Sequence, residues 1–404
     1  MRRKGAGSID ELVRPRRARL TSTPRPRNRR AQILAAASVL FSERGYHNVG
    51  TEDIASSVGI TAGALYRHFR SKQELLACTV AESFDQAGEL LIAHGIDDLT
   101  ALLHGLAETA GTRRDLGVLW NREIRHLPPE EQAALRDRLH DVVSRLSAVL
   151  GHSVPGVSGA DAELLAWCIL AVLTSPGYHR TEILPGRLIE LLATIAMAVG
   201  AAPLDSAAEP AADLPGRAGM APASRREALL GAATRLFGAK GYQAVTMDEI
   251  AAAVQVHSAS VYRLFDTKAD LLAAVIDRGA EPLQLGLSQA LFSADTSQEA
   301  LDAAVDAYIA FAMIHHDLLA VLTSEVLSLP PARRRAVRSA QHDYVGQWFQ
   351  LLEESRPELD DTEVRFRVHA ALTIVNDVSR TVRLRCMPNV QERVRLAARR
   401  ALYG

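Results

Sequence analysis

Cysteine is scarce in this sequence, and the few that occur are scattered along it. Cys78, Cys168 and Cys386 form no Cys-x-x-Cys pair, so neither a disulfide framework nor a cysteine zinc site is predicted. His315 and His316 are adjacent, and neighbouring residues on a helix point about 100° apart, unlike the i, i+4 pair that binds metal. We therefore predict no metal and no cofactor.

Long hydrophobic runs are also missing. No apolar stretch reaches the roughly 18 residues that span a bilayer. The Arg-rich beginning lacks the apolar stretch and cleavage site of a secretory signal. We expect a cytoplasmic protein with no membrane partner.

Catalytic patterns are absent as well. The sequence has no Gly-x-Ser-x-Gly elbow, and its paired carboxylates, such as Glu130 and Glu131, resemble solvated surface runs rather than an acid/base pair. No Gly-rich phosphate loop follows a strand, and no apolar/polar alternation predicts a sheet. The sequence therefore predicts an all-α protein that is not an enzyme.

The net charge of −1 conceals an uneven distribution. Residues 1–30 contain eleven arginines and lysines but only two acidic residues, Asp10 and Glu11. We interpret residues 1–28 as a basic disordered arm. Two interpretations stay open: a solvated tail, or a flexible arm that contacts DNA phosphates or a narrow minor groove.

An internal repeat organises the 404 residues. Residues 45–76 match residues 241–272 without gaps at an offset of 196, and the similarity resumes at Glu123 and Glu325 with an offset of 202. A whole two-part unit has therefore been duplicated. Identical pairs in the first stretch include Gly45/Gly241, Tyr46/Tyr242, Ile54/Ile250, Ala55/Ala251, Tyr66/Tyr262, Phe69/Phe265 and Lys72/Lys268.

A segment rich in alanine and proline separates the copies and has no helical periodicity, so we assign it as an exposed linker. The predicted organisation is the basic arm (1–28), a first helix-turn-helix domain (29–76), a first helical domain (77–200), the linker (201–223), a second helix-turn-helix domain (224–272) and a second helical domain (273–404).

Each repeat has the spacing of a helix-turn-helix. In the first copy, a helix over residues 29–43 stops before Gly45, where a left-handed cap is expected. Short helices over residues 52–58 and 62–69 follow, and the second copy repeats them at 247–254 and 258–265. Apolar residues of both short helices face inward, which leaves one face of the second short helix free for a major groove.

These residues resemble the TetR family of bacterial one-component regulators, with VGITAGALYRHFRSKQELL matching the recognition-helix signature and QVHSASVYRLFDTKADLL a more diverged example. The resemblance implies a partner of double-stranded DNA. Hydroxyl and imidazole groups suit base edges, and a lysine at a helix start suits phosphate. The candidate DNA-binding residues are Arg29, Thr51, Thr61, Ala62, Gly63, Tyr66, His68, Lys72, Thr246, His257, Ser258, Ser260, Tyr262 and Lys268.

The two copies depart from the family pattern in different places. The second copy has Thr246 at the expected N-cap, whereas the first has Gly50 there and Thr51 one residue later. In the inter-helix turn the first copy has Gly59 and the second has Gln255, which costs roughly 1 kcal/mol if the position is left-handed. If one DNA-binding domain has lost function, we expect it to be the second.

The resemblance also implies a helical domain that binds a small molecule and dimerises through a four-helix bundle. Residues 161–175 with 187–199, and 362–380 with 390–402, are candidate pairing helices, although their apolar residues could equally fill each domain's own core. Two segments of the form ExxxLPP resemble family members that respond to acyl-CoA or other lipid-derived effectors. The candidate ligand residues are Trp120, Glu123, His126, Trp167, Phe311, Glu325, His342 and Trp348.

The leading hypothesis is an effector-responsive repressor in which the ligand changes the separation of the DNA-binding domains. Its assembly is either an intramolecular pseudo-dimer on an asymmetric operator or a homodimer. The alternative is a helical protein-interaction module in which one or both DNA-binding units have lost function.

Overall fold

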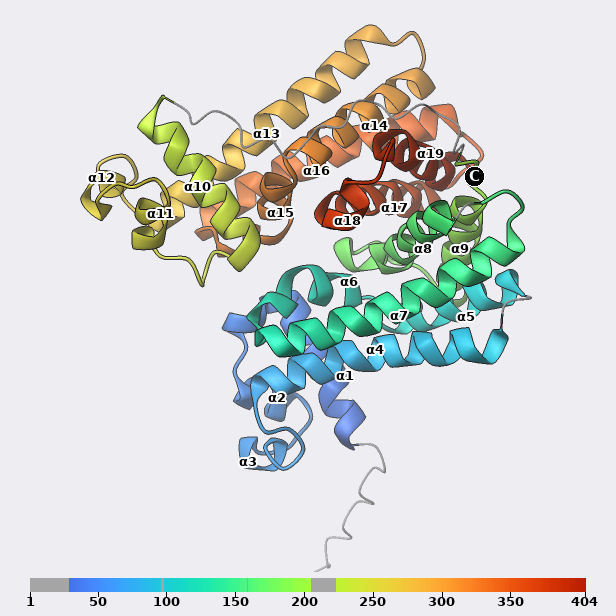
Figure 1. Cartoon of the computed structure of the whole chain (residues 1–404), viewed down its shortest axis with the longest axis horizontal. Coiled ribbons are helices and arrows are strands. Elements are labelled where there is room, and N and C mark those ends of the chain that lie inside the picture. Colours follow the sequence, from blue (N-terminus) through green and yellow to red (C-terminus); the bar gives the residue numbers. More distant parts are fainter. Residues whose placement is uncertain (1–28, 96–97, 158, 205–222) are drawn as a thin grey trace, which may run out of the picture.

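The computed structural model describes residues 29–95, 98–157, 159–204 and 223–404 (Figure 1). The basic arm predicted for residues 1–28 lies outside the described residues, as does most of the predicted linker. The described part of the chain is helical and contains no strand, as the sequence predicted.

The first unit comprises nine α-helices among the described residues. They are α1 (Arg29–Arg44), α2 (Thr51–Ser57), α3 (Ala62–Leu65), α4 (Lys72–His94), α5 (Leu99–Thr112), α6 (Leu116–Val118), α7 (Pro129–Ser153), α8 (Gly159–Thr174) and α9 (Pro185–Gly200). Short segments between them are the 3₁₀ turns η1 (Tyr46–Asn48), η3 (Ile124–His126) and η4 (Ser175–Tyr178) and the π-helical turn η2 (Leu119–Glu123). We call α1 to α3 and the start of α4 the first head.

The second unit repeats this order. Its helices are α10 (Arg225–Lys240), α11 (Met247–Ala253), α12 (Ser258–Tyr262), α13 (Lys268–Ser293), α14 (Ser297–Ile314), α15 (His316–Ser324), α16 (Pro331–Ser355), α17 (Asp361–Arg380), α18 (Val382–Arg385) and α19 (Val390–Tyr403), with the turn η5 (Val326–Ser328) before α16. The second head consists of α10 to α12 and the start of α13, and Figure 1 shows the two heads apart from each other.

Two backbone positions in each head require unusual angles. Gly59 has φ 68° and Gln255 has φ 57°, so the inter-helix turn is left-handed in both copies. Gly45 and Gly241 also have positive φ, 83° and 82°, but their ψ values are 147° and 152°. The expected left-handed helical cap is therefore wrong there. These extended angles with positive φ are accessible almost only to glycine.

The units meet through one helical pair from each. Helices α8 and α9 of the first unit pack against α17 and α19 of the second, and these four helices are neighbours in Figure 1. Apolar residues from both sides, such as Ile169 of α8 and Ile374 of α17, are fully buried. Ion pairs cross the contact at Asp161 with Arg393 (3.3 Å) and at Glu163 with Arg383 (2.7 Å).

One helical segment within the described ranges, Gly159–Tyr178, is long and apolar enough to cross a membrane, and the bent pair Ser297–Ile314 and His316–Ser324 would pass the same test as a single span. Two thirds of the first segment's most apolar window is buried inside the protein. The core helix of a globular protein has the same composition. The apolar surface of α8 is accounted for by its packing on α7, α9 and α17.

Candidate nucleic-acid interface and effector cavity

In the first head, one face of α3 and of the turn after it is buried and the other is exposed. Leu65 and Phe69 are buried against α1 and α2, whereas Tyr66, Arg67 and His68 are exposed. The helix is shorter than predicted, ending at residue 65 and continuing as a turn to residue 68. The exposed side chains therefore project from this turn as well as from the helix.

Short polar contacts fix the candidate DNA-binding residues of the first head. Thr61 caps α3 by accepting from the Ala64 backbone N–H at 3.2 Å, and the Thr51 hydroxyl lies 3.3 Å from the Tyr66 hydroxyl. No side chain caps α2, because Gly50 has none; its N–H instead donates to Asp53 at 2.7 Å. Around Gly63 the structure leaves open space beside α3.

The second head has the same framework but different contacts on its exposed face. Thr246 caps α11 together with Glu249, as the sequence predicted. Ser258 donates to the carboxylate of Asp248, and Ser260 accepts from Arg263 at 3.0 Å. His257 precedes α12 without capping it. Two hydroxyls expected at DNA are therefore engaged within the head itself.

The lysines expected to bind phosphate turn toward their own heads. Lys72 donates to the Tyr46 carbonyl, and Lys268 donates to the Tyr242 and Val245 carbonyls at 2.9 Å each. Their ammonium groups lie 4.0 and 4.2 Å from the centres of the two tyrosine rings, and burial lowers the pKa of both. In this structure they stabilise the Gly-Tyr turn rather than offering a free cation.

Arg29, the remaining candidate, is also used internally. Its guanidinium donates to the Val58 carbonyl at 3.1 Å and so links the start of α1 to the end of α2.

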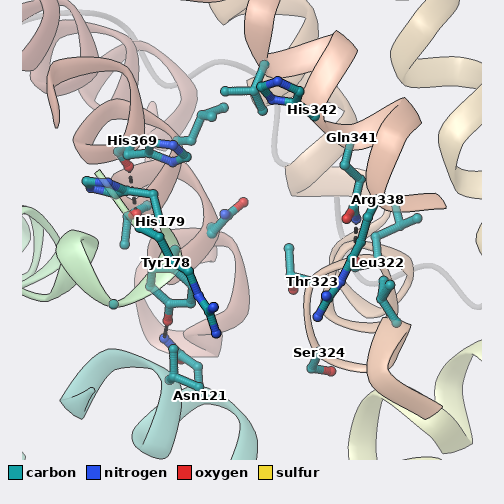
Figure 2. Close-up of a pocket in the computed structure, with 18 of the residues that line it drawn as sticks. Asn121, Tyr178, His179, Leu322, Thr323, Ser324, Arg338, Gln341, His342 and His369 are labelled. Atoms are coloured by element: carbon teal, nitrogen blue, oxygen red, sulfur yellow. Dashed lines mark hydrogen bonds between the residues drawn. The ribbon is translucent and has the colours of Figure 1, made fainter. Parts of the chain in front are cut away.

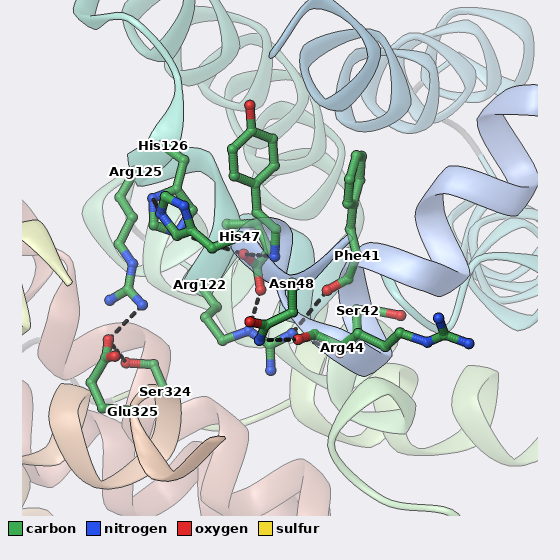
Figure 3. A network of polar contacts seen from close by, with 12 residues as sticks. Phe41, Ser42, Arg44, His47, Asn48, Arg122, Arg125, His126, Ser324 and Glu325 are labelled. Carbon is green, nitrogen blue, oxygen red and sulfur yellow. Dashed lines mark hydrogen bonds and ion pairs between the residues drawn. The ribbon is translucent and has the colours of Figure 1, made fainter. Parts of the chain in front are cut away.

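A buried polar network attaches the first head to its own unit (Figure 3). Glu123 accepts from the Tyr46 backbone N–H at 2.9 Å and pairs with Arg122, which also donates to the Phe41 and Ser42 carbonyls at the end of α1. His126 stacks on the Tyr46 ring with centroids 5.3 Å apart. Burial and the nearby Arg125 lower the pKa of His126 to about 3, so its ring is neutral near pH 7.

The equivalent glutamate of the second unit has a different partner. Glu325 is buried and pairs across the units with Arg125, Nη2 to Oε1 2.5 Å (Figure 3). Ser324 stands where the first unit has Arg122 at the repeat offset of 202. The same Arg125 side chain touches the turn of the second head, because a Cβ on Gly241 would lie 2.8 Å from its Cζ.

A cavity of about 1470 Å³ lies between the two units (Figure 2). Helices α13 to α17 supply most of its wall, including Ile276, Leu319, Arg338 and His342. The first unit supplies the rest, from residues 176–182, the α5 to η2 region and the end of α1. In Figure 2, Asn121, Tyr178, His179 and His369 lie on one side, and Leu322, Thr323, Ser324, Arg338, Gln341 and His342 on the other.

Two small-for-large differences widen the space on the side of the second unit. In the first unit, the rings of Phe84 and Trp120 pack edge to face, 5.3 Å apart. At the repeat offsets the second unit has Ala280 and Leu322, and both line the cavity. Fewer side-chain atoms at these two positions leave volume unfilled.

The seam between the units is held by a chain of hydrogen bonds. Tyr178 donates to the Gly117 carbonyl at 2.9 Å and accepts from Asn121 at 2.6 Å, and Asn121 also donates to Asp377 of the second unit at 3.0 Å. Burial raises the pKa of Asp377 to about 6. Gly117 permits this close packing, since a Cβ there would lie 2.9 Å from the Thr174 carbonyl oxygen.

Comparison with known proteins gives two matches to one family model. "Bacterial regulatory proteins, tetR family" matches residues 33–78 and again 229–275, and "Tetracyclin repressor-like, C-terminal domain" matches residues 294–380. The chain belongs to the TetR family. The two matches confirm a duplicated TetR module, and the matched proteins are regulators rather than enzymes.

Individual relatives cover parts of this chain. A transcriptional repressor KstR2 from Rhodococcus jostii is 32% identical over 111 residues, 26% of this chain and 54% of the relative. A transcriptional activator FasR from Mycolicibacterium smegmatis is 44% identical over 57 residues, 14% of this chain and 26% of the relative. The chain thus spans about half, or less, of the length of these curated relatives.

Solved structures of the family align with one unit's worth of chain. A TetR-family regulator from Bordetella parapertussis has a TM-score of 0.42 and 17% identity, covering 44% of this chain and 94% of that one. A ketosteroid regulator KstR2 from Mycobacterium tuberculosis has a TM-score of 0.39 and 22% identity, covering 42% and 89%.

The candidate ligand residues of this TetR protein lie in different places: one lines the cavity, and the others belong to buried polar networks or to the core. His342 lines the cavity, whereas Glu123, His126 and Glu325 belong to the buried networks and Trp120 fills the first unit. Aromatic residues chosen for an apolar helix face turn out to be packing groups, as is common for such residues. Trp348 is fully buried behind Tyr308 and Tyr344, Phe311 contacts His315, and Trp167 packs against the core.

Sequence reasoning missed the residues that the first unit contributes to the cavity. Tyr178, His179 and Arg180 follow α8, the most apolar helix among the described residues. A polar cluster at the end of an apolar helix was the available signal, but its proximity to the second unit depends on the packing between units.

Proposed function

We propose that this TetR-family protein is a sequence-specific, effector-responsive DNA-binding repressor that acts in the cytoplasm as one chain with two heads. In this proposal the two units form an intramolecular pseudo-dimer and occupy an asymmetric operator. The observation that carries it is the packing of α8 and α9 on α17 and α19 within a single chain.

The chemistry of that contact supports pairing within the chain. Its central residues are apolar and fully buried, as in an obligate interface. Asp161 and Arg393 form an ion pair in which both side chains are at least nine-tenths buried, and this burial is favourable only while the units stay together. A homodimer with four heads would need a further surface.

The position of the cavity supports control of both heads by a ligand. Val39, Ser42 and Glu43 at the end of α1 line it, and so do Leu322 and Ser324 of α15, which packs on α10 of the second head. A bound molecule that moved these helices would change the separation of the heads, which has to match the spacing of two half-sites. The apolar lining suits an acyl-CoA or another lipid-derived effector.

Light scattering of the purified chain tests the assembly. The proposal requires a species near the chain mass of 43.8 kDa at micromolar concentration, and a species of twice that mass would contradict it.

Footprinting on the DNA upstream of its own gene tests the function. A footprint over two half-sites at one chain per site supports the proposal. No protected region, with a partner protein bound instead, favours the interaction-module alternative.

A further inference from the structure

Two arginines in the cavity wall have buried nitrogens without acceptors. Arg114 comes from the first unit and Arg380 from the end of α17 in the second. Nε and Nη2 of Arg114, and Nε of Arg380, are buried and have no hydrogen-bond partner among the residues described. Buried guanidinium N–H groups almost always find an acceptor, because leaving one unpaired is costly.

The two guanidinium groups flank the same turn. The charge of Arg114 acts on His179, whose pKa is lowered to about 2, first by burial and then by His369 and Arg114. The charge of Arg380 acts on the preceding residue, Tyr178, whose pKa is raised by burial and by Asp377. The geometry agrees: a Cβ on Gly177 would contact the Arg114 carbonyl oxygen, and α17, which carries Arg380, packs on η4. The two arginines therefore line one end of the cavity from opposite units.

Carboxylates in the same wall are engaged elsewhere. Asp277 pairs with Arg333, Asp115 lies 3.6 Å from Arg113, and Glu43 lies 4.0 Å from Arg180. The carboxylates that remain are Glu182, which is exposed, and Asp377 behind the wall, which accepts from Asn121 at 3.0 Å. His179 and His369 stack with centroids 4.3 Å apart and are neutral near pH 7. The charges of Asp377 and Arg380 act on each other, and Nη2 of Arg380 donates to the Thr323 hydroxyl. The unmatched charge at this end is therefore that of Arg114, and Nε of Arg380 adds a buried donor without an acceptor.

The rest of the wall is apolar and extended. Ile276 and Leu283 of α13, Leu319 of α15, and Val337 and Phe349 of α16 face the same space. A molecule that fills it presents a long apolar body to these residues and one charged end to the arginines.

We propose, building on the effector response proposed above, that the ligand is an amphipathic anion whose carboxylate or phosphate binds Arg114 of the first unit together with Arg380 of the second. One molecule then bridges both units, and each chain binds a single ligand for its two heads. Arginine forks are suited to either oxyanion.

Isothermal titration of the full chain with three twelve-carbon probes tests this site. Dodecanoate supplies a carboxylate, dodecanoyl-CoA supplies phosphates, and dodecanol has the same chain without charge. We expect one anionic probe to bind at one molecule per chain and dodecanol to bind at least about tenfold more weakly, the value of one charge-assisted hydrogen bond. The anion that binds more tightly identifies the headgroup.

Variants on each side of the seam test the bridge. Arg114→Gln and Arg380→Gln should each weaken the anion about tenfold and leave dodecanol unchanged, whereas Arg145→Gln removes the same charge from the surface of α7 and should change nothing. Arg114→Lys and Arg380→Lys should recover part of the affinity. Circular dichroism checks that each variant is folded, and the lysine variants are used alone if a glutamine variant is not.

Four outcomes would overturn the inference: no binding by either anion, two molecules per chain, equal affinity for dodecanol, or anion affinity unchanged in either arginine variant. Operator binding measured with and without probe separates this inference from the proposed function. An anion that binds as predicted but leaves the footprint unchanged refutes the effector response and not the site. A footprint that responds to an uncharged compound, with no anion bound, refutes the site alone.

Discussion

Glu123 and Glu325 occupy equivalent positions of the duplicated unit, and both are buried at the base of a head. Glu123 pairs with Arg122 beside it, whereas Glu325 pairs with Arg125 of the other unit. The first unit therefore supplies the cation for both. Because the first unit is always present on the same chain, the second unit can have Ser324 in place of the arginine that would otherwise pair with Glu325.

The two units also differ in how fully equivalent positions of their interiors are packed. The rings of Phe84 and Trp120 pack together in the first unit, whereas the smaller Ala280 and Leu322 of the second unit line the cavity between the units. The first unit thus supplies the arginine that pairs with Glu325, and the second supplies the smaller side chains that line the cavity. The two copies have become complementary parts of one assembly.

The largest expected effect comes from removing the shared cation. Arg125→Met leaves the Glu325 carboxylate buried without a cation, with only the Ser324 and Ser328 hydroxyls beside it, which should lower the free energy of unfolding by about 3 kcal/mol. Urea denaturation followed by circular dichroism measures it. Arg125→Met combined with Glu325→Gln should recover much of the loss, because the uncompensated charge is gone. A single variant as stable as the parent would mean that the second unit does not depend on the first.

The exposed tyrosines compare the heads directly. Tyr66→Ala should weaken operator binding about tenfold, the effect of losing a base or phosphate contact, and Tyr262→Ala should weaken it less. Near Tyr262, Ser258 and Ser260 are already engaged within the second head. Fluorescence anisotropy with labelled operator measures both affinities. Equal losses would show that the heads contribute alike.

A charge difference just before α4 and α13, the helices that follow each helix-turn-helix, should have a smaller effect on operator affinity. Arg70 precedes α4, and Asp266 precedes α13 at the same repeat position. Asp266→Arg should raise operator affinity on the order of fivefold and steepen the salt dependence by about one phosphate contact. Arg70→Asp should do the reverse. Asp295→Arg, at the far end of α13, makes the same charge change and should leave the slope unaltered.

The helices and the helix-turn-helix were predictable because their signals are local. Apolar periodicity, the capping Thr246 and the left-handed turn at Gln255 follow from a few neighbouring residues. The exposure of Tyr66 and His68 also follows from which face of the short helix is apolar.

The internal uses of polar residues were not predictable. Lys72 turns to the Tyr46 carbonyl rather than to solvent because the Gly-Tyr turn presents an acceptor beside an aromatic ring. The partnership of Arg125 with Glu325 depends on how the units pack, and no spacing in the sequence encodes it. The cavity lies between the units and is wider at Ala280 and Leu322, which is a difference between copies rather than a motif.

The smallest effect concerns the backbone of the inter-helix turn. Gln255 has φ 57° where the first head has Gly59 with φ 68°. A side chain in this region costs about 1 kcal/mol, and glycine returns part of that through its greater freedom when unfolded. Gln255→Gly should therefore stabilise the chain by only about 0.5 kcal/mol, and Gly59→Gln should destabilise it by as much. Thermal unfolding of the two single variants and the exchange of both residues measures this. Opposite shifts that cancel in the exchange would show that the two turns are interchangeable, so that the difference between the heads lies in their side chains and not in their backbone.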